Sequence, residues 1–136
     1  MSQPTVTHVW EDRFGEVIDH ADDGYLEIRW YDTTEAMSVG DFQSWLAGFA
    51  GEVERRRRAG ILVDVTRFLM DQSGMDDAWW YEQIVPRYNA AGVEKFAFLA
   101  PDGTPAIGAP PAATGPANFS TGYFGRRQDA LDWLGS

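Results

Sequence analysis

The stretch ILVDVTRFLMDQSGM, residues 61–75, joins an apolar run to a polar turn and decides the fold. Residues 61–65 are β-branched or apolar except for Asp64, and this pattern predicts a short strand buried on both faces. Such strands belong to sheets that are covered by helices. The stretch therefore predicts an α/β domain, with a turn and a helix following the strand.

The chain before this stretch predicts a β-hairpin and a helix. Residues 16–32 alternate polar and apolar side chains around an Asp23-Gly24 turn, as a hairpin does. Apolar residues recur at helical spacing over residues 39–53, directly after Ser38, a residue type that caps helices. Gly60 is placed to end this helix. We therefore expect a mixed sheet that is opened by an N-terminal hairpin.

The chain after the stretch predicts two more helices and one more strand. A second helix runs from about residue 75 to residue 89, and Pro86 should kink or locally break it. Residues 95–100 predict an interior strand, and residues 126–134 predict a last helix. The Pro/Gly/Ala-rich segment 101–118 exceeds the usual connection of about 4–6 residues. It is either a mobile flap or an arm packed on the surface or on a partner subunit.

Length and composition indicate one globular domain. The chain has 136 residues, of which 44% are hydrophobic, and we assign residues 15–136 to the domain and residues 1–14 to an N-terminal extension. The absence of cysteine excludes disulfides, thiolate nucleophiles and cysteine-based zinc sites. No apolar run is long enough to span a membrane, and the first residues lack the features of a signal peptide. We therefore expect a cytoplasmic protein.

Charge argues against nucleic acid as a partner. The formal net charge is -10, whereas nucleic-acid binding depends on the neutralisation of phosphates by Lys and Arg. The single basic run, RRRR at 55–58, lies at the end of the predicted helix, where cations are favoured. We interpret this run as a solvated helix end.

No complete catalytic motif occurs in the sequence. A serine nucleophile needs a nearby base, and the two histidines, His8 and His20, lie outside any recognisable triad context. Asp71, Asp76 and Asp77 do not have the spacing of a calcium loop, and an acidic first helical turn explains them. We therefore expect no catalytic residue, no metal, no cofactor and no enzymatic activity.

Ser73 has two readings. It precedes Asp76 by three residues, which is the form of a helix-capping box, and Gly74 relaxes the turn. A hydroxyl at a helix N-terminus is also a place where an added phosphate is held by free N–H groups. Asp64, near the carboxyl end of the strand, and Asp71 are the other candidates in this partner-binding loop, because ligands gather at that edge of open α/β sheets.

Three consecutive aromatic residues follow in the second helix. Trp79, Trp80 and Tyr81 cannot all face one side of a helix, so at least one points to a surface, groove or subunit. Core packing and an interface are equally good explanations for any one of them, but the triplet taken together favours an interface or an apolar groove.

The stretch ILVDVTRFLMDQSGM resembles the strand, loop and helix of STAS domains, the anti-sigma-factor antagonists, in which an apolar strand leads to Asp-Ser-Ser-Gly. The resemblance places the serine that is phosphorylated in that family at Ser73 and the motif's aspartate at Asp71. Two departures from the pattern are Gln72, in place of the first serine, and a spacing between Asp64 and Asp71 that is one residue shorter.

Residues 15–134 as a whole are more similar to the SpoIIAA-like branch of STAS proteins, which has features of SEC14/CRAL-TRIO domains. The similar segments are YLEIRW, ILVDV, KFAFLA and the closing pattern of Phe124, Ala130, Trp133 and Leu134. These are mostly core patterns, so the resemblance implies a fold, a single STAS-like domain, more than an activity.

Three functions remain open on this basis. The first is a regulatory module that binds a protein partner through the loop at Asp71–Ser73 and the second helix, with phosphorylation of Ser73 as a switch; we expect a homodimer. The second is a small apolar ligand or lipid carrier, with a pocket under the second helix and the segment 101–118. An enzyme is the third and has the least support in the sequence.

Overall fold

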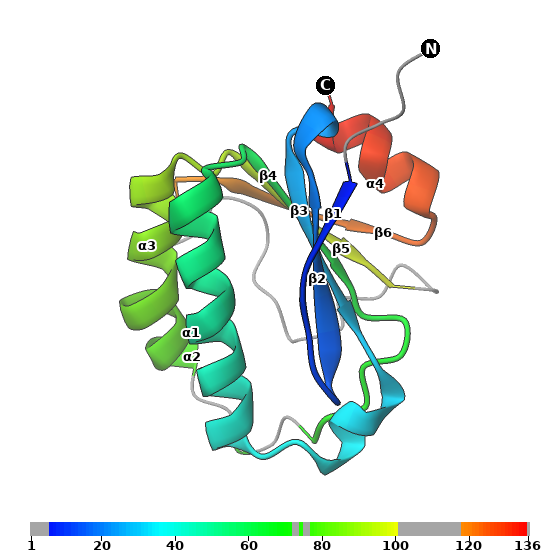
Figure 1. Ribbon diagram of the computed structural model, residues 1–136, viewed down its shortest axis with the longest axis vertical. Coiled ribbons are helices and arrows are strands. Elements are labelled where there is room, and N and C mark those ends of the chain that lie inside the picture. The colour runs from blue at the N-terminus through cyan, green and yellow to red at the C-terminus, as the bar shows by residue number, and fades with distance from the viewer. Residues whose placement is uncertain (1–5, 72–73, 75–76, 101–117, 136) are drawn as a thin grey trace.

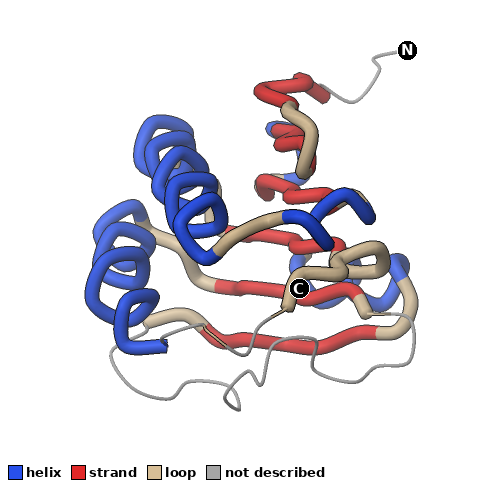
Figure 2. The backbone as a smooth tube through the Cα atoms, turned by 90° about the horizontal axis from the view of Figure 1, so that it is seen from below, coloured by secondary structure: helices blue, strands red, loops and turns tan. Residues whose placement is uncertain are grey.

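The computed structural model describes residues 6–71, 74, 77–100 and 118–135. Within these residues, six strands form one mixed sheet, and each strand lies beside its neighbour in the chain. Figure 2 shows the strands stacked in succession, with α1 and α3 along one side. The strands are β1 (Val6–Glu11), β2 (Gly15–His20), β3 (Tyr25–Trp30), β4 (Gly60–Asp64), β5 (Lys95–Leu99) and β6 (Ser120–Phe124). The expected α/β fold with a mixed sheet is confirmed.

The pairing of neighbouring strands changes once across the sheet, from antiparallel to parallel. β1, β2 and β3 pair antiparallel, and β3, β4, β5 and β6 pair parallel. The expected hairpin is β2 and β3, joined by the short 3-10 helix η1 (Ala21–Asp23) and by Gly24, whose φ of 76° suits glycine. A second 3-10 helix, η2 (Asp32–Ala36), follows β3.

Residues 6–11, predicted to belong to an N-terminal extension outside the domain, form β1, the edge strand that pairs with β2. β6 is also absent from the prediction, which has no strand between residues 95–100 and the last helix. Both are edge strands with mostly exposed or half-buried residues. Their sequences therefore lack the strong apolar pattern of the central strands.

Helix α1 (Val39–Arg56) begins at Ser38, as expected. Its capping box is reciprocal: Asp41 N donates to Ser38 Oγ over 3.0 Å, and Ser38 N donates to Asp41 Oδ2 over 3.1 Å. The helix ends at Arg57, which has a φ of 52°, and not at Gly60. Gly60 instead begins β4, where an added Cβ would lie 3.1 Å from Tyr25 Cβ.

The second predicted helix is interrupted, as the position of Pro86 indicated. It consists of α2 (Asp77–Trp79), a π-helical turn η3 (Trp80–Ile84) and α3 (Val85–Ala91). Val85 N bonds to Trp80 O, five residues back, and the regular helix resumes with Pro86 in its first turn. Gly92 ends α3 with a φ of 90°.

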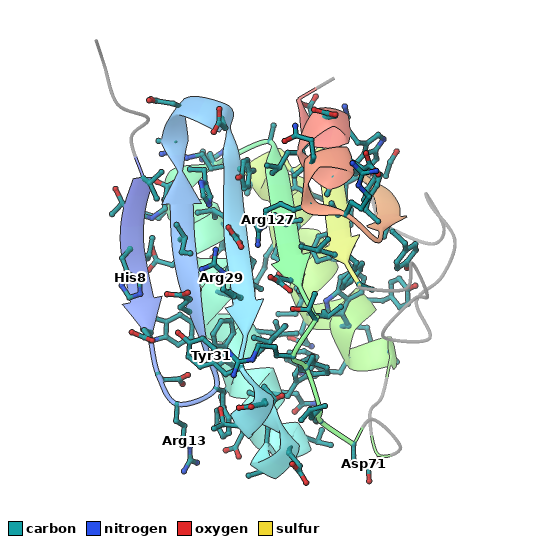
Figure 3. The ribbon with its side chains drawn as sticks, turned by 90° about the vertical axis from the view of Figure 1, so that its right-hand side faces the viewer. His8, Arg13, Arg29, Tyr31, Asp71 and Arg127 are labelled. Atoms are coloured by element: carbon teal, nitrogen blue, oxygen red, sulfur yellow. The ribbon has the colours of Figure 1, made fainter. Side chains whose placement is uncertain are left out.

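Helices cover the two faces of the sheet unequally. Figure 1 shows α1 and α3 side by side on one face and α4 (Arg127–Leu134) on the other. The first face carries the main core, which includes Trp30, Phe49 and Phe96. α4 packs on β4, β5 and β6 through a smaller cluster centred on Leu62 and Ala130. Figure 3 shows that no described helix lies in front of β1 and β2 on this second face.

Candidate functional site

The loop after β4 is held to the neighbouring segment η2. Leu69 N donates to Thr34 Oγ1 over 2.9 Å, and Thr34 Oγ1 donates to Tyr31 O over 2.7 Å. Thr34 is fully buried, whereas the side chain of Leu69 is 53% exposed. The backbone of the loop is therefore fixed while an apolar side chain points to solvent.

An open depression of about 670 Å³ lies beside this loop. It is lined by Arg13, Phe14, Asp32, Thr33, Glu35, Ala36 and Leu69. Thr33 Oγ1 donates to Arg13 O, and Arg67 pairs with Asp32 over 3.3 Å, so its rim is cross-linked by polar contacts. Figure 3 shows Arg13 and Asp71 at the same end of the sheet. The carboxyl edge of β3 and β4 thus carries both the depression and the described part of the candidate loop.

Asp64 was grouped with this loop, but its side chain bonds within the second face of the sheet. Asp64 Oδ1 accepts hydrogen bonds from Thr66 N and Thr66 Oγ1 over 3.0 and 2.7 Å. Its Oδ2 accepts a hydrogen bond from Arg127 Nη2 of α4 over 3.1 Å. Asp64 therefore turns the chain out of β4 and helps to hold α4.

Glu27 is the most deeply buried charge of the described residues, with an exposed fraction of 0%. Its carboxylate accepts hydrogen bonds from Arg127 Nη2 over 2.9 Å and from Arg29 Nη2 over 3.1 Å, and contacts His20 Nε2 at 2.8 Å. Burial alone raises the pKa of Glu27, but the hydrogen bonds from His20 and Arg127 lower it to about 2. Glu27 is therefore ionised at neutral pH.

This network extends across the second face. Arg29 Nη1 also donates to Glu16 Oε1 over 3.2 Å, and His8 Nε2 lies 3.0 Å from Glu16 Oε2. Figure 3 shows His8 on β1, Arg29 on β3 and Arg127 from α4 on the same face. The alternation of polar and apolar residues in 16–32 predicts that Glu27 and Arg29 share a polar face. The sequence gives no indication that Arg127 joins them, because its partners Asp64 and Glu27 are 63 and 100 positions away in the chain.

The basic run at 55–58 also has a structural partner. Arg56 and Arg58 both pair with the buried Asp19 at 2.9 Å. Hydrogen bonding from Arg58 lowers the pKa of Asp19, with burial opposing it. Arg56 also pairs with Glu52, four residues earlier in α1, over 3.1 Å. In the sequence, the sign that Asp19 has a structural role is its position as a charged residue directly after the apolar residues of its strand.

The aromatic triplet packs toward the core. Trp79, Trp80 and Tyr81 are all partly buried against the main cluster. The ring of Trp80 lies edge-on to Phe96 and Phe119, with centroids 6.1 and 6.3 Å apart. The ring of Trp80 therefore packs between η3 and β5.

Several sequence-predicted positions lie outside the described residues. These are Ser73 and the segment 101–117, together with Asp76 of the proposed capping box. Gly74 and Asp71 are described, and both are exposed.

Among the described residues, no helix combines the length and apolarity needed to cross a membrane. Comparison with known proteins finds no counterpart, since no family model, no curated protein and no solved structure matches the chain.

Proposed function

We propose that the protein is a non-enzymatic, STAS-like regulatory module that binds a protein partner at the depression beside the loop after β4. The observation that supports this proposal is the exposed Leu69 at the rim, on a backbone that is anchored by Thr34. Because the backbone at Leu69 is already fixed, a partner that covers this side chain does not also have to order the loop.

The chemistry of the depression favours a basic partner segment with an apolar anchor. Phe14, Ala36 and Leu69 offer apolar surface. Glu35 offers a carboxylate, and Asp32 offers a second one that already pairs with Arg67 over 3.3 Å, while Arg13 also lines the depression. The net charge of -10 favours approach of a positively charged segment from a distance. We therefore expect the partner to present an apolar side chain that is flanked by Lys or Arg.

Phosphorylation of Ser73 is the proposed switch. A phosphate adds a charge of about -1.5 to -2, two residues after Asp71 in the chain. For a basic partner the added charge strengthens binding, so Ser73→Asp should increase affinity and Ser73→Ala should abolish the effect of phosphorylation.

A photoreactive amino acid at position 36 tests the binding surface in lysate of the host organism. We expect it to capture one defined protein, and we expect Leu69→Asp to reduce capture about 10-fold or more, as removal of an interface anchor does. The matched control places the same photoreactive group at position 83, on the exposed side of η3. Equal capture from positions 36 and 83, or capture that Leu69→Asp leaves unchanged, would contradict the proposal.

Native mass spectrometry and phosphosite mapping on protein from the host test the remaining parts. We expect a homodimer and a phosphorylated fraction at Ser73. If Ser73 is unmodified and Ser73→Asp binds the partner as the wild type does, the proposed switch is wrong. The proposed binding surface is not contradicted by that result.

A further inference from the structure

The edge of the second face brings together three side chains with metal-ligating atoms. His8 and Glu11 come from β1, and Glu16 comes from β2. One ligand atom from each residue lies within 4.8 Å of the other two. None of these three residues lines the depression beside Leu69, which is the proposed docking surface.

A β-bulge creates the cluster. Residues 8 and 11 of a regular strand point to opposite faces, because side chains alternate. In β1 the register shifts between His8, which pairs with Ile18, and Trp10, which pairs with Val17. The bulge turns Glu11 onto the face of His8, while Trp10 packs on Trp45 of α1 at a centroid distance of 4.4 Å.

The distances suit a small divalent cation. His8 Nε2 lies 3.0 Å from Glu16 Oε2 and 3.7 Å from Glu11 Oε1. Ligand bonds of about 2.0–2.2 Å in tetrahedral geometry place ligand atoms about 3.4 Å apart. These two separations fall on either side of this value, so small side-chain movements suffice to bring the three ligand atoms to it.

Each carboxylate is held by its other oxygen. Tyr31 Oη donates to Glu11 Oε2, and Arg29 Nη1 donates to Glu16 Oε1 over 3.2 Å. The oxygens that face His8 are Glu11 Oε1 and Glu16 Oε2. Outer hydrogen bonds of this kind orient metal ligands in metalloproteins.

The geometry points to a site for one Zn²⁺-class divalent cation, ligated by His8 Nε2, Glu11 Oε1 and Glu16 Oε2. One imidazole and two carboxylates suit a borderline transition ion better than Mg²⁺ or Ca²⁺, which prefer oxygen ligands alone. The side chains of His8 and Glu11 are 52% and 50% exposed, which leaves room for a water or an external ligand in the fourth position. His20, the second histidine, instead contacts Glu27 and stacks on Tyr25.

Calorimetric titration of the full chain with Zn²⁺, after removal of metal by a chelator, tests the site. We expect one ion per chain, and we expect His8→Ala, Glu11→Gln and Glu16→Gln each to weaken binding at least about 10-fold. Tyr31→Phe should also weaken it, because the orienting donor to Glu11 is lost. Glu82→Gln removes the same charge from an exposed position on η3 and should leave the affinity unchanged.

Nuclear magnetic resonance of the two imidazoles provides a readout that needs no variant. Zn²⁺ should shift the Nε2 resonance of His8 and leave that of His20 in place, and excess Mg²⁺ should not reverse the shift. No binding, or binding that survives Glu11→Gln and Glu16→Gln, means that the three residues form an ion pair only, and it overturns the proposal. A shift of His20 alone overturns it as well.

Discussion

Arg127 and Glu27 are 100 residues apart in the chain, and Arg127 Nη2 donates to Glu27 Oε2 over 2.9 Å. The first residue of α4 therefore reaches a carboxylate that is wholly inside the sheet. Since Arg127 also bonds to Asp64 over 3.1 Å, one guanidinium ties the last helix to both β3 and β4.

Arg127→Gln should lower the free energy of unfolding by about 2 kcal/mol, because a buried carboxylate loses a charged partner. Glu27 keeps His20 and Arg29, which limits the loss. Urea denaturation measures the difference. Arg126→Gln removes the same charge from the neighbouring exposed position and should change stability by less than about 0.5 kcal/mol. Equal losses in the two variants would show that Arg127 acts only through net charge.

Stability should fall as the pH drops from 4.5 toward 2. The pKa of Glu27 is lowered from 4.5 to about 2 in the folded protein, so in this window the unfolded chain binds more protons than the folded chain. The contribution of Glu27 is therefore complete above pH 4.5 and is lost as the pH falls, by an amount of about 3 kcal/mol. Asp19, whose pKa is also lowered, acts in the same direction.

Denaturation curves of the wild type and Glu27→Gln across this window isolate the effect. The variant should show a shallower dependence of unfolding free energy on pH, whatever its stability at neutral pH. Parallel dependences would mean that other carboxyl groups cause the acid sensitivity.

Trp80→Ala should destabilise the fold by about 3 kcal/mol, since it removes a ring that packs on Phe96 and Phe119. Tyr81→Ala is the comparison from the same π-helical turn. The ring of Tyr81 contacts Trp80 at a centroid distance of 5.4 Å, and we expect a smaller loss. Thermal unfolding checks the order. A larger loss for Tyr81 would reverse the assignment of Trp80 to the core.

Arg57→Gly should raise the free energy of unfolding by up to about 1 kcal/mol. Arg57 ends α1 with a φ of 52°, a conformation that glycine adopts at lower cost than other residues. Arg55→Gly, inside the same helix, should lower it by about 1 kcal/mol. Urea denaturation should therefore show changes of opposite sign in the free energy of unfolding of the two variants. A loss of stability in both variants would contradict the prediction.

The sequence predicted those elements whose signals lie close together in the chain. Ser38 and Pro86 each act on the neighbouring turn, and the predicted cap and break are present. The hairpin turn at Gly24 is equally local. β1 was missed because its bulge breaks the alternation of side chains and because most of its residues are exposed.

The candidate sites were harder to predict, because they depend on distant pairings. Asp64 was recognised as a polar break in an apolar strand, but its partner Arg127 lies 63 positions later. The cluster of His8, Glu11 and Glu16 depends on a bulge that no local pattern indicated. The STAS-like arrangement and the role of Ser73 remain predictions.

The sequential strand order, β1 to β6, has a consequence for synthesis on the ribosome. When a strand leaves the ribosome, the edge of the preceding strand, with which it pairs, is still exposed. No later strand has to insert between two earlier ones. The sheet can therefore grow by addition at one edge, with α1 and α3 docking as each crossover is completed. α4 follows β6 in the chain, and its first residue, Arg127, pairs with the buried carboxylate of Glu27 on β3. This carboxylate therefore gains its α4 partner only after all six strands have been synthesised.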